Sequence, residues 1–325
     1  MNRQHLPTHA PGHAPAHALP GDPAPVDRVP DHRIAVDGLS VGYGDSLIID
    51  DLTTTIPGGA LTTVIGPNGC GKSTFLRAVC RLIPSRSGRV TLGGDDISSM
   101  RRRDLARRIG VLPQSPVAPE GLIVSDLVAR GRHPHQSWIR QWSSTDEEEV
   151  LRALELTNVA DLAERRVESL SGGQRQRVWI SMVLAQHTDI LFLDEPTTFL
   201  DLSHSIEILD LVADLRSALD RTVVMVLHDL NLAVRYSDHL IVMRDGAVVA
   251  TGAPGDIITA ELLKDVFDLD AVVVDDPVTG GPLIVPCAPR GRADAPGHAA
   301  TAASTPDHAA TATPGHAHAG PGRTP

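Results

Sequence analysis

Three short runs of apolar or β-branched residues in the middle of the chain predict buried strands. Ile190–Leu193 and Val223–Leu227 contain no polar side chain, which is typical of strands that are buried on both faces. Leu61–Ile65 is a third β-prone run, and it ends in a glycine-rich turn. A helix is predicted after that turn, over residues 72–82.

A hairpin is predicted nearer the C-terminus. Leu240–Met243 and Ala247–Ala250 flank Asp245-Gly246, a dipeptide that favours a tight turn between two strands. Because strands and helices alternate along the chain, we expect an α/β fold. Its mixed β-sheet core would contain a parallel sheet and a smaller antiparallel β portion.

The strand signals stop between residues 115 and 170, where helical signals replace them. Thr145 to Glu148 matches the capping-box pattern of a helix start. Apolar residues follow at roughly helical spacing: Val150, Leu151, Leu154 and Leu156. The pattern predicts a helical subdomain inserted into the α/β core.

Both ends of the chain differ in composition from its middle. Residues 1–32 and 289–325 are rich in Pro, His and Ala and contain little that could form a core, so we expect two disordered tails. The histidines of the second tail could hold a metal weakly, although composition alone favours a solvated segment. A single domain is then expected over residues 33–288.

Charge, cysteine content and the longest apolar runs narrow the possible functions. The net charge of −11 argues against a broad basic surface for nucleic acid. Cys70, Cys80 and Cys287 form no paired or metal-ligand pattern, which favours a reducing compartment. No apolar run approaches the roughly 20 residues that span a bilayer. We therefore expect any membrane role to depend on a partner.

The strongest chemical signal follows the Leu61–Ile65 strand and matches the phosphate-binding loop pattern in full. Its glycines let backbone N–H groups surround phosphate oxygens, and the following helix adds a partial positive charge. Lys72 is positioned to reach the β- and γ-phosphates of a bound nucleotide, and Ser73 to bind Mg²⁺. The loop consists of Gly66, Pro67, Asn68, Gly69, Cys70, Gly71, Lys72, Ser73 and Thr74.

Two acidic residues end the Ile190–Leu193 strand. In such folds the carboxyl end of a buried strand lies beside the phosphate loop. We expect Asp194 to hold Mg²⁺ and Glu195 to orient or deprotonate the attacking water. Phosphoryl transfer depends mainly on positioning and charge stabilisation, so a few groups suffice.

A second anion site is predicted around residues 170–177. Ser171 and Gln174 have capping-box spacing at a helix start, and Gly172 and Gly173 permit close backbone approach. The stretch Leu-Ser-Gly-Gly-Gln-Arg-Gln-Arg resembles the signature motif of ABC transporter ATPases at every core position. The resemblance extends over residues 33–288 and implies the ABC type of P-loop NTPase, with ATP and Mg²⁺ as cofactors and the helical subdomain at about 115–175.

The resemblance also implies roles for single residues. Tyr43 matches the aromatic that stacks on adenine, and Gln114 the glutamine that senses Mg²⁺ and takes part in catalysis. His228 matches the switch histidine that contacts the γ-phosphate, and Leu200-Asp201 the loop that crosses a dimer interface. In this family the signature faces the phosphate loop of a second ATPase subunit, which implies a two-fold pair, expected here as a homodimer.

Three further stretches resemble the ATPases that import ferric siderophores, haem and cobalamin. They span residues 128–136, 197–204 and 275–278, and the family docks its permease near residues 128–142. The resemblance implies an ATP-hydrolysing importer subunit on the cytoplasmic face of the membrane, with permease subunits as direct partners and a substrate-binding protein as an indirect one. Ferric siderophores are the expected cargo, with haem or cobalamin as the alternative.

A different class of protein also fits part of the pattern. A soluble ABC-type regulatory ATPase that acts on ribosomes would share the phosphate loop and the signature. Such proteins usually carry two ATPase domains and basic segments, whereas this acidic chain has one loop and one signature. The importer subunit is therefore the better prediction.

Overall fold

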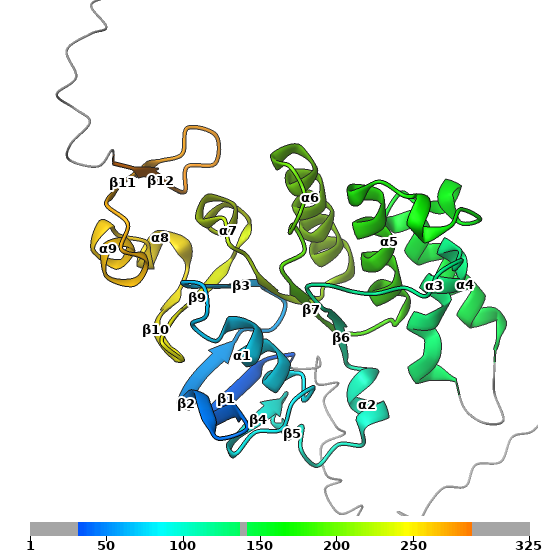
Figure 1. The fold of residues 1–325 in the computed structure, drawn as a ribbon, viewed down its shortest axis with the longest axis horizontal. Coiled ribbons are helices and arrows are strands. Elements are labelled where there is room, and N and C mark those ends of the chain that lie inside the picture. Colours follow the sequence, from blue (N-terminus) through cyan, green and yellow to red (C-terminus); the bar gives the residue numbers. More distant parts are fainter. Residues whose placement is uncertain (1–31, 137–141, 288–325) are drawn as a thin grey trace, which may run out of the picture. The chain divides into compact units, whose positions relative to one another are not determined.

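The computed structural model describes residues 32–136 and 142–287. The predicted tails lie outside these ranges, apart from residue 32, as does part of the predicted permease-docking segment 128–142. The central sheet has six strands in the order β10-β9-β3-β8-β7-β6 (Figure 1). Its strands are β3 (Leu61–Ile65), β6 (Ile109–Leu112), β7 (Ile190–Asp194), β8 (Thr222–Val226), β9 (His239–Arg244) and β10 (Ala247–Gly252).

The predicted parallel sheet and its hairpin are both present. Strands β9, β3, β8, β7 and β6 pair in parallel, and β10 pairs antiparallel with β9 through the predicted turn. Along β8, Val223 and Met225 belong to one core, and Val224 and Val226 to the other. Burial on both faces explains why this strand has a continuous apolar sequence.

A second, antiparallel sheet covers one face of the central sheet. Its order is β2-β1-β4-β5, with β1 (Ile34–Tyr43), β2 (Ser46–Ile56), β4 (Ser87–Leu92) and β5 (Asp95–Asp96). Helix α1 (Lys72–Val79) lies between the two sheets, where Phe75 and Leu76 join a core with residues from both. The sequence did not predict these strands, because register shifts between β1 and β2 break the regular alternation of side chains.

Helix α1 is shorter than the predicted 72–82. It ends at Val79 with Cys80 as its cap, and Arg81 has a positive φ of 55°, which an α-helix cannot continue. The Arg81 guanidinium instead donates to the carbonyl oxygens of Ile97 and Met100. A tertiary contact thus fixes the residue that terminates the helix.

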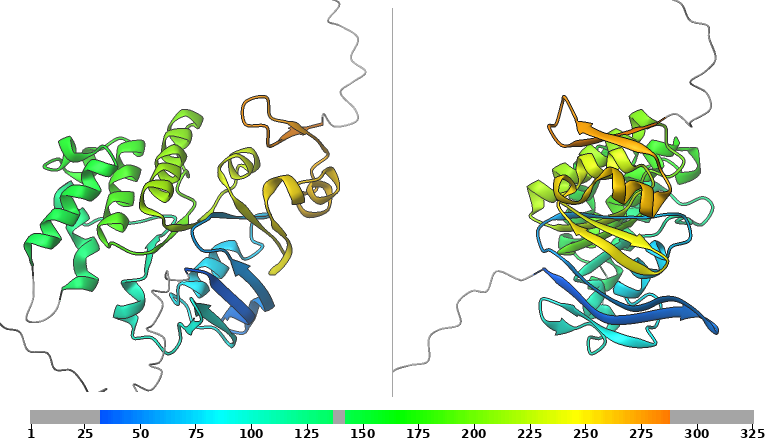
Figure 2. Two further views of the ribbon diagram at one scale, coloured as in Figure 1. Left: turned by 180° about the vertical axis from the view of Figure 1, so that it is seen from behind. Right: turned by 90° about the vertical axis from the view of Figure 1, so that its left-hand side faces the viewer.

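Helices cover the other face of the central sheet (Figure 2). Helices α5 (Gly172–Ala185), α6 (Leu202–Leu219) and α7 (Leu230–Tyr236) share one core with alternate residues of the strands. The predicted helical insertion is present and packs against α5. Its elements are α3 (Val124–Ala129), η1 (Arg130–His135), α4 (Ser144–Leu156), η2 (Ala160–Leu162) and η3 (Val167–Ser169), whereas the short helix α2 (Arg102–Ala106) precedes β6 and lies before the predicted insertion.

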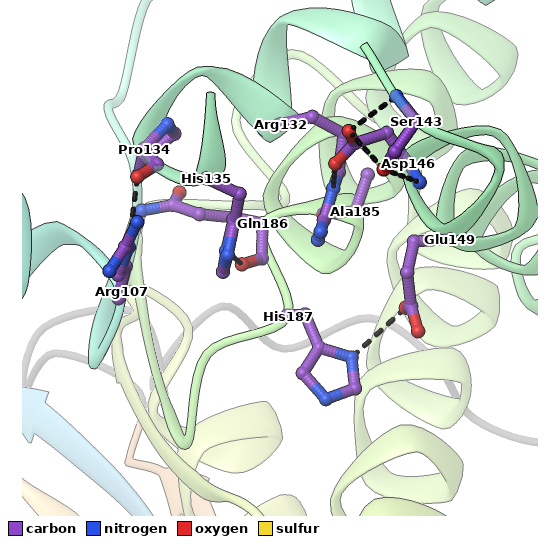
Figure 3. A network of polar contacts seen from close by, with 10 residues as sticks. All are labelled: Arg107, Arg132, Pro134, His135, Ser143, Asp146, Glu149, Ala185, Gln186 and His187. Atoms are coloured by element: carbon purple, nitrogen blue, oxygen red, sulfur yellow. Dashed lines mark hydrogen bonds and ion pairs between the residues drawn. The ribbon is translucent and has the colours of Figure 1, made fainter. Parts of the chain in front are cut away.

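The capping box of α4 lies two residues before the predicted Thr145–Glu148. Ser143 accepts a bond from the Asp146 N–H, and the Asp146 carboxylate accepts one from the Ser143 N–H. Asp146 also forms a buried ion pair with Arg132 of η1, at 2.9 Å between Nε and Oδ1 (Figure 3). The local pattern could not reveal this distant partner, which helps to fix where the helix begins.

The C-terminal part of the described chain adds elements that the sequence did not predict. They are α8 (Pro254–Ile257), α9 (Ala260–Phe267) and a two-stranded sheet of β11 (Ala271–Asp275) and β12 (Pro282–Pro286). All three cysteines are free thiols, and Cys70 and Cys80 are buried. Within the described residues, no helix is long and apolar enough to span a membrane.

Candidate nucleotide-hydrolysis site

The phosphate loop joins β3 to α1. Gly69 and Gly71 have φ values of 79° and 104°, which side chains rarely tolerate, so the loop requires glycine at both positions. Lys72 is the first residue of α1, and its ammonium donates to the carbonyl oxygens of Gly66 at 2.9 Å and Pro67 at 2.8 Å. The loop therefore fixes the lysine across its own backbone, beside the N-terminus of the helix.

A pocket of about 460 Å³ opens over this loop. Most of its lining residues were predicted for the nucleotide site, although they come from distant parts of the chain. The lining comprises Tyr43, Ile48, Asn68, Gly69, Gly71, Lys72, Ser73, Thr74, Gln114, Glu195 and His228. A half-exposed aromatic ring at one part of the lining and cationic and carboxylate groups at another fit a nucleoside triphosphate.

Glu195 is the polar centre of the pocket. Its Oε2 accepts bonds from Gln114 Nε2 at 2.6 Å and from Thr198 Oγ1 at 2.9 Å. Its Oε1 lies 2.6 Å from His228 Nε2. The carboxylate is buried, whereas His228 is about half exposed. Three side chains from separate loops thus hold one carboxylate in a fixed orientation.

The backbone of Glu195 is also unusual. Its φ of 54° lies in the left-handed region, which a residue other than glycine seldom adopts. Glu195 directly follows β7, so this turn redirects the chain at the carboxyl end of a buried strand. Such conformations persist when their surroundings fix them, and they concentrate at functional sites.

Asp194 and Ser73 form the second polar pair. Ser73 Oγ donates to Asp194 Oδ1 at 3.0 Å, which links the start of α1 to the end of β7. Burial raises the pKa of Asp194, the hydrogen bond from Ser73 opposes that effect, and the nearby Glu195 charge adds to it. A hydroxyl and a carboxylate oxygen are the hard ligands that Mg²⁺ prefers. The residues present therefore fit the predicted ion.

The second predicted anion site lies at the start of α5. Ser171 and Gln174 form the predicted capping box, with each side chain bonded to the backbone N–H of the other. A Cβ placed on Gly173 would lie 2.9 Å from the His204 ring of α6, so glycine also lets these two helices approach. Among the described residues that line the nucleotide pocket, none belongs to this motif.

Two residues of the site, Thr198 and Ile48, were not predicted from the sequence. Thr198 donates a hydrogen bond to Glu195. Thr198 lies in the stretch 197–204 that resembles siderophore importers, but that resemblance does not indicate this contact. Ile48 of β2 lines the pocket beside the phosphate loop. A Cβ on Gly71 would lie 3.4 Å from the Ile48 side chain, so this strand closes over the loop. Recognising Ile48 would have required the β1–β2 register, which the sequence did not show.

The fold and the pocket define a nucleoside triphosphatase of the phosphate-loop class. The family model for "ABC transporter" matches residues 49–198. The solved structure of cbiO1 from Clostridium perfringens, part of the ABC transporter complex cbiONQ, has a TM-score of 0.62 and is 28% identical. That likeness covers 70% of this chain and 90% of cbiO1.

Curated relatives are more similar in sequence. The probable siderophore transport system ATP-binding protein YusV of Bacillus subtilis (strain 168) is 53% identical over 80% of this chain and 93% of its own length. The ferric enterobactin transport ATP-binding protein FepC of Escherichia coli (strain K12) is 49% identical over 78% of this chain and 94% of its own length. A cobalamin import ATP-binding protein, BtuD of Halobacterium salinarum, is 43% identical over 80% of this chain and 65% of its own length.

The chain belongs to the ATP-binding subunits of ABC transporters. These subunits bind ATP, hydrolyse it in a reaction coupled to transport, and work with permease subunits. The predicted fold class is thereby confirmed.

Proposed function

We propose that this chain hydrolyses ATP to power the import of ferric siderophores, as a peripheral subunit on the cytoplasmic face of the cell membrane. The observation that carries the enzymatic part is the buried Glu195 carboxylate, held by Gln114, Thr198 and His228 above the phosphate loop. The cargo is supported by relatives at about 50% identity whose names specify siderophore transport in one case and ferric enterobactin transport in the other.

Each side chain has a distinct task in this mechanism. Tyr43 stacks on the adenine ring, and Lys72 leaves its loop carbonyls to neutralise the β- and γ-phosphates. Glu195 takes the proton of the attacking water, or orients that water, while Gln114 and Thr198 fix its second oxygen. His228 donates to the γ-phosphate as charge develops there.

Mg²⁺ would be held by Ser73, Asp194 and Gln114, and it would supply charge neutralisation at the phosphates. The protein's own contribution is the pre-formed pair of Ser73 and Asp194. The Gln114 side chain donates a hydrogen bond to Glu195 and is also a proposed ligand of the ion, so it connects the carboxylate to the ion site.

We further propose that two copies of the chain act together. The signature residues Ser171 to Gln174 contribute nothing to the pocket of their own chain. A head-to-tail pair would bring the α5 N-terminus of one copy onto the nucleotide of the other, which uses both predicted anion sites. A substrate-binding protein would act on the permease and not on this chain directly.

Cellular uptake tests the cargo. Cells whose only copy carries Glu195→Gln should lose uptake of radiolabelled iron supplied as a ferric siderophore, and the unmodified chain should restore it. Cobalamin and haem uptake in the same cells serve as the controls for cargo. Unchanged iron uptake together with loss of cobalamin or haem uptake would refute the siderophore assignment and favour the alternative.

A further inference from the structure

One segment of subfamily resemblance, residues 275–278, lies far from the nucleotide pocket and has no task in the mechanism. Asp275 ends β11, and residues 276–278 begin the turn of the β11–β12 hairpin. The backbone N–H of Asp276 donates to Gly281 at 2.7 Å, and that of Gly280 donates to Asp276 at 2.8 Å. The Asp276 side chain accepts from the Val278 N–H at 2.8 Å. These hydrogen bonds fix the conformation of the turn that joins the two strands of the hairpin.

Asn231 of α7 attaches the hairpin. Its Nδ2 donates to the carbonyl oxygen of Ile284 at 3.1 Å, and its Oδ1 accepts from the Ile284 N–H at 2.9 Å. Ile284 is buried in the middle of β12 and pairs with Val273 on the other side. The amide group of Asn231 thus occupies the place of a neighbouring strand and satisfies both backbone groups.

Helix α7 connects this contact to the catalytic pocket. The helix starts at Leu230 and is capped by Asp229, whose carboxylate accepts from the Leu232 N–H at 2.9 Å. His228, which contacts Glu195, immediately precedes that cap. Asn231 therefore lies in the first helical turn after the catalytic histidine, with no flexible segment between them.

The two ends of α7 are held by different elements. At its C-terminal end, Tyr236 donates to Asp210 of α6 at 2.7 Å, and Ser237 donates to Thr63 of β3 at 2.6 Å. Among the described residues, the side-chain hydrogen bonds that tie the first turn to another element are those of Asn231. The hairpin thus supplies polar contacts that hold this turn, alongside the apolar packing of Leu230, Leu232 and Ala233 in the core.

We propose that Asn231 is a positioning residue for His228, and that it acts by fixing the first turn of α7 to the C-terminal hairpin. The inference rests on the proposed catalytic role of His228. It assigns the β11–β12 hairpin a part in hydrolysis, although no hairpin residue lines the nucleotide pocket.

The test measures ATP hydrolysis by the full chain carrying Asn231→Ala. We expect kcat to fall about five-fold, which corresponds to roughly 1 kcal/mol of activation free energy, because both hydrogen bonds to Ile284 are lost but the apolar packing of the helix remains. KM for ATP should stay within about two-fold, because Asn231 does not touch the nucleotide pocket. Asn231→Asp keeps the acceptor for Ile284 N–H and should give an intermediate kcat. Val285→Ala, on the exposed side of the same strand, is the matched control and should leave kcat unchanged.

A double-mutant cycle separates positioning from simple stabilisation of the hairpin. In a His228→Ala background, Asn231→Ala should cause no further loss, since its effect passes through the histidine. An equal loss in both backgrounds, or an unchanged kcat for Asn231→Ala when His228→Ala is impaired, would overturn the inference alone. Full activity of His228→Ala would overturn the proposed role of His228 together with it.

Discussion

At the scale of single residues, the proposed mechanism depends on how Glu195 is held. Its left-handed backbone costs on the order of 1–3 kcal/mol, and the contacts from Gln114, Thr198 and His228 offset that cost while aiming the carboxylate. Pre-organised groups of this kind need little rearrangement in the transition state, which is where electrostatic catalysis gains most. The proposed mechanism therefore predicts that substitution of any of the three supporting side chains slows hydrolysis.

Thr198 offers a test of this support. Thr198→Val keeps the shape of the side chain and removes the hydroxyl that donates to Glu195 Oε2. We expect kcat to fall by about three- to ten-fold with KM for ATP nearly unchanged, because the bond orients a catalytic group and does not bind substrate. Steady-state ATPase assays measure both constants.

Thr197→Val is the matched control for that variant. No hydrogen bond from Thr197 to Glu195 is present in the described part of the chain. Its kcat should match that of the unmodified chain. Equal activity of the Thr198 and Thr197 variants would show that Glu195 does not depend on the hydroxyl.

At the scale of elements, one joint connects η1, α4 and the C-terminal end of α5 (Figure 3). Arg132 pairs with Asp146 and also donates to the Ala185 carbonyl oxygen at 2.8 Å, while the His135 ring contacts the Gln186 carbonyl at 2.7 Å. Cationic and polar groups at a helix C-terminus satisfy carbonyls that have no partner within the helix. The joint fixes one end of the helix whose other end carries the signature.

Breaking the ion pair should destabilise this joint. Both side chains are about 95% buried, so Asp146→Asn leaves the Arg132 charge without its counter-ion in a buried place. We expect a loss of about 3 kcal/mol in the free energy of unfolding at pH 7, measured by urea titration. Glu207→Gln removes the partly exposed pair with Arg177 and serves as the control, with a loss below about 1 kcal/mol.

The difference in stability between the unmodified chain and Asp146→Asn should also depend on pH. Burial alone would raise the pKa of Asp146, but the hydrogen bonds from Ser143 and Arg132 outweigh it and hold that pKa below its ordinary value. The advantage of the unmodified chain over Asp146→Asn should therefore be complete above the ordinary pKa of an aspartate. It should decline as pH falls through the lowered value in the folded state. An advantage that grows on acidification would contradict the assigned direction.

At the scale of the whole molecule, the features that could be predicted from the sequence are those formed by residues close together in the chain. The phosphate loop, the acidic end of β7 and the β9–β10 hairpin each combine a short motif with its own flanking strand. The predicted nucleotide residues Tyr43, Gln114, Glu195 and His228 line one pocket, although they are far apart in the sequence. They could be predicted together because the resemblance to a family implies a common tertiary fold. Their catalytic roles stay predictions.

Features that depend on distant partners could not be predicted from the sequence. The bulged register of β1 and β2 hid the antiparallel sheet, and with it Ile48. Asp146 accepts a hydrogen bond in the cap of α4 and also pairs with the buried Arg132, and the second contact depends on the tertiary fold. Asn231 bonds Ile284 across 53 positions in the sequence, and no local pattern marks either residue.

The central claim is that Glu195 performs the hydrolysis, and turnover by Glu195→Gln tests it most directly. Glutamine keeps the size of the side chain and an oxygen acceptor but cannot take a proton from water. We expect ATP binding equal to that of the unmodified chain and a turnover rate at least about a hundred-fold lower. Normal turnover in this variant would contradict the assignment of Glu195 and the mechanism built on it.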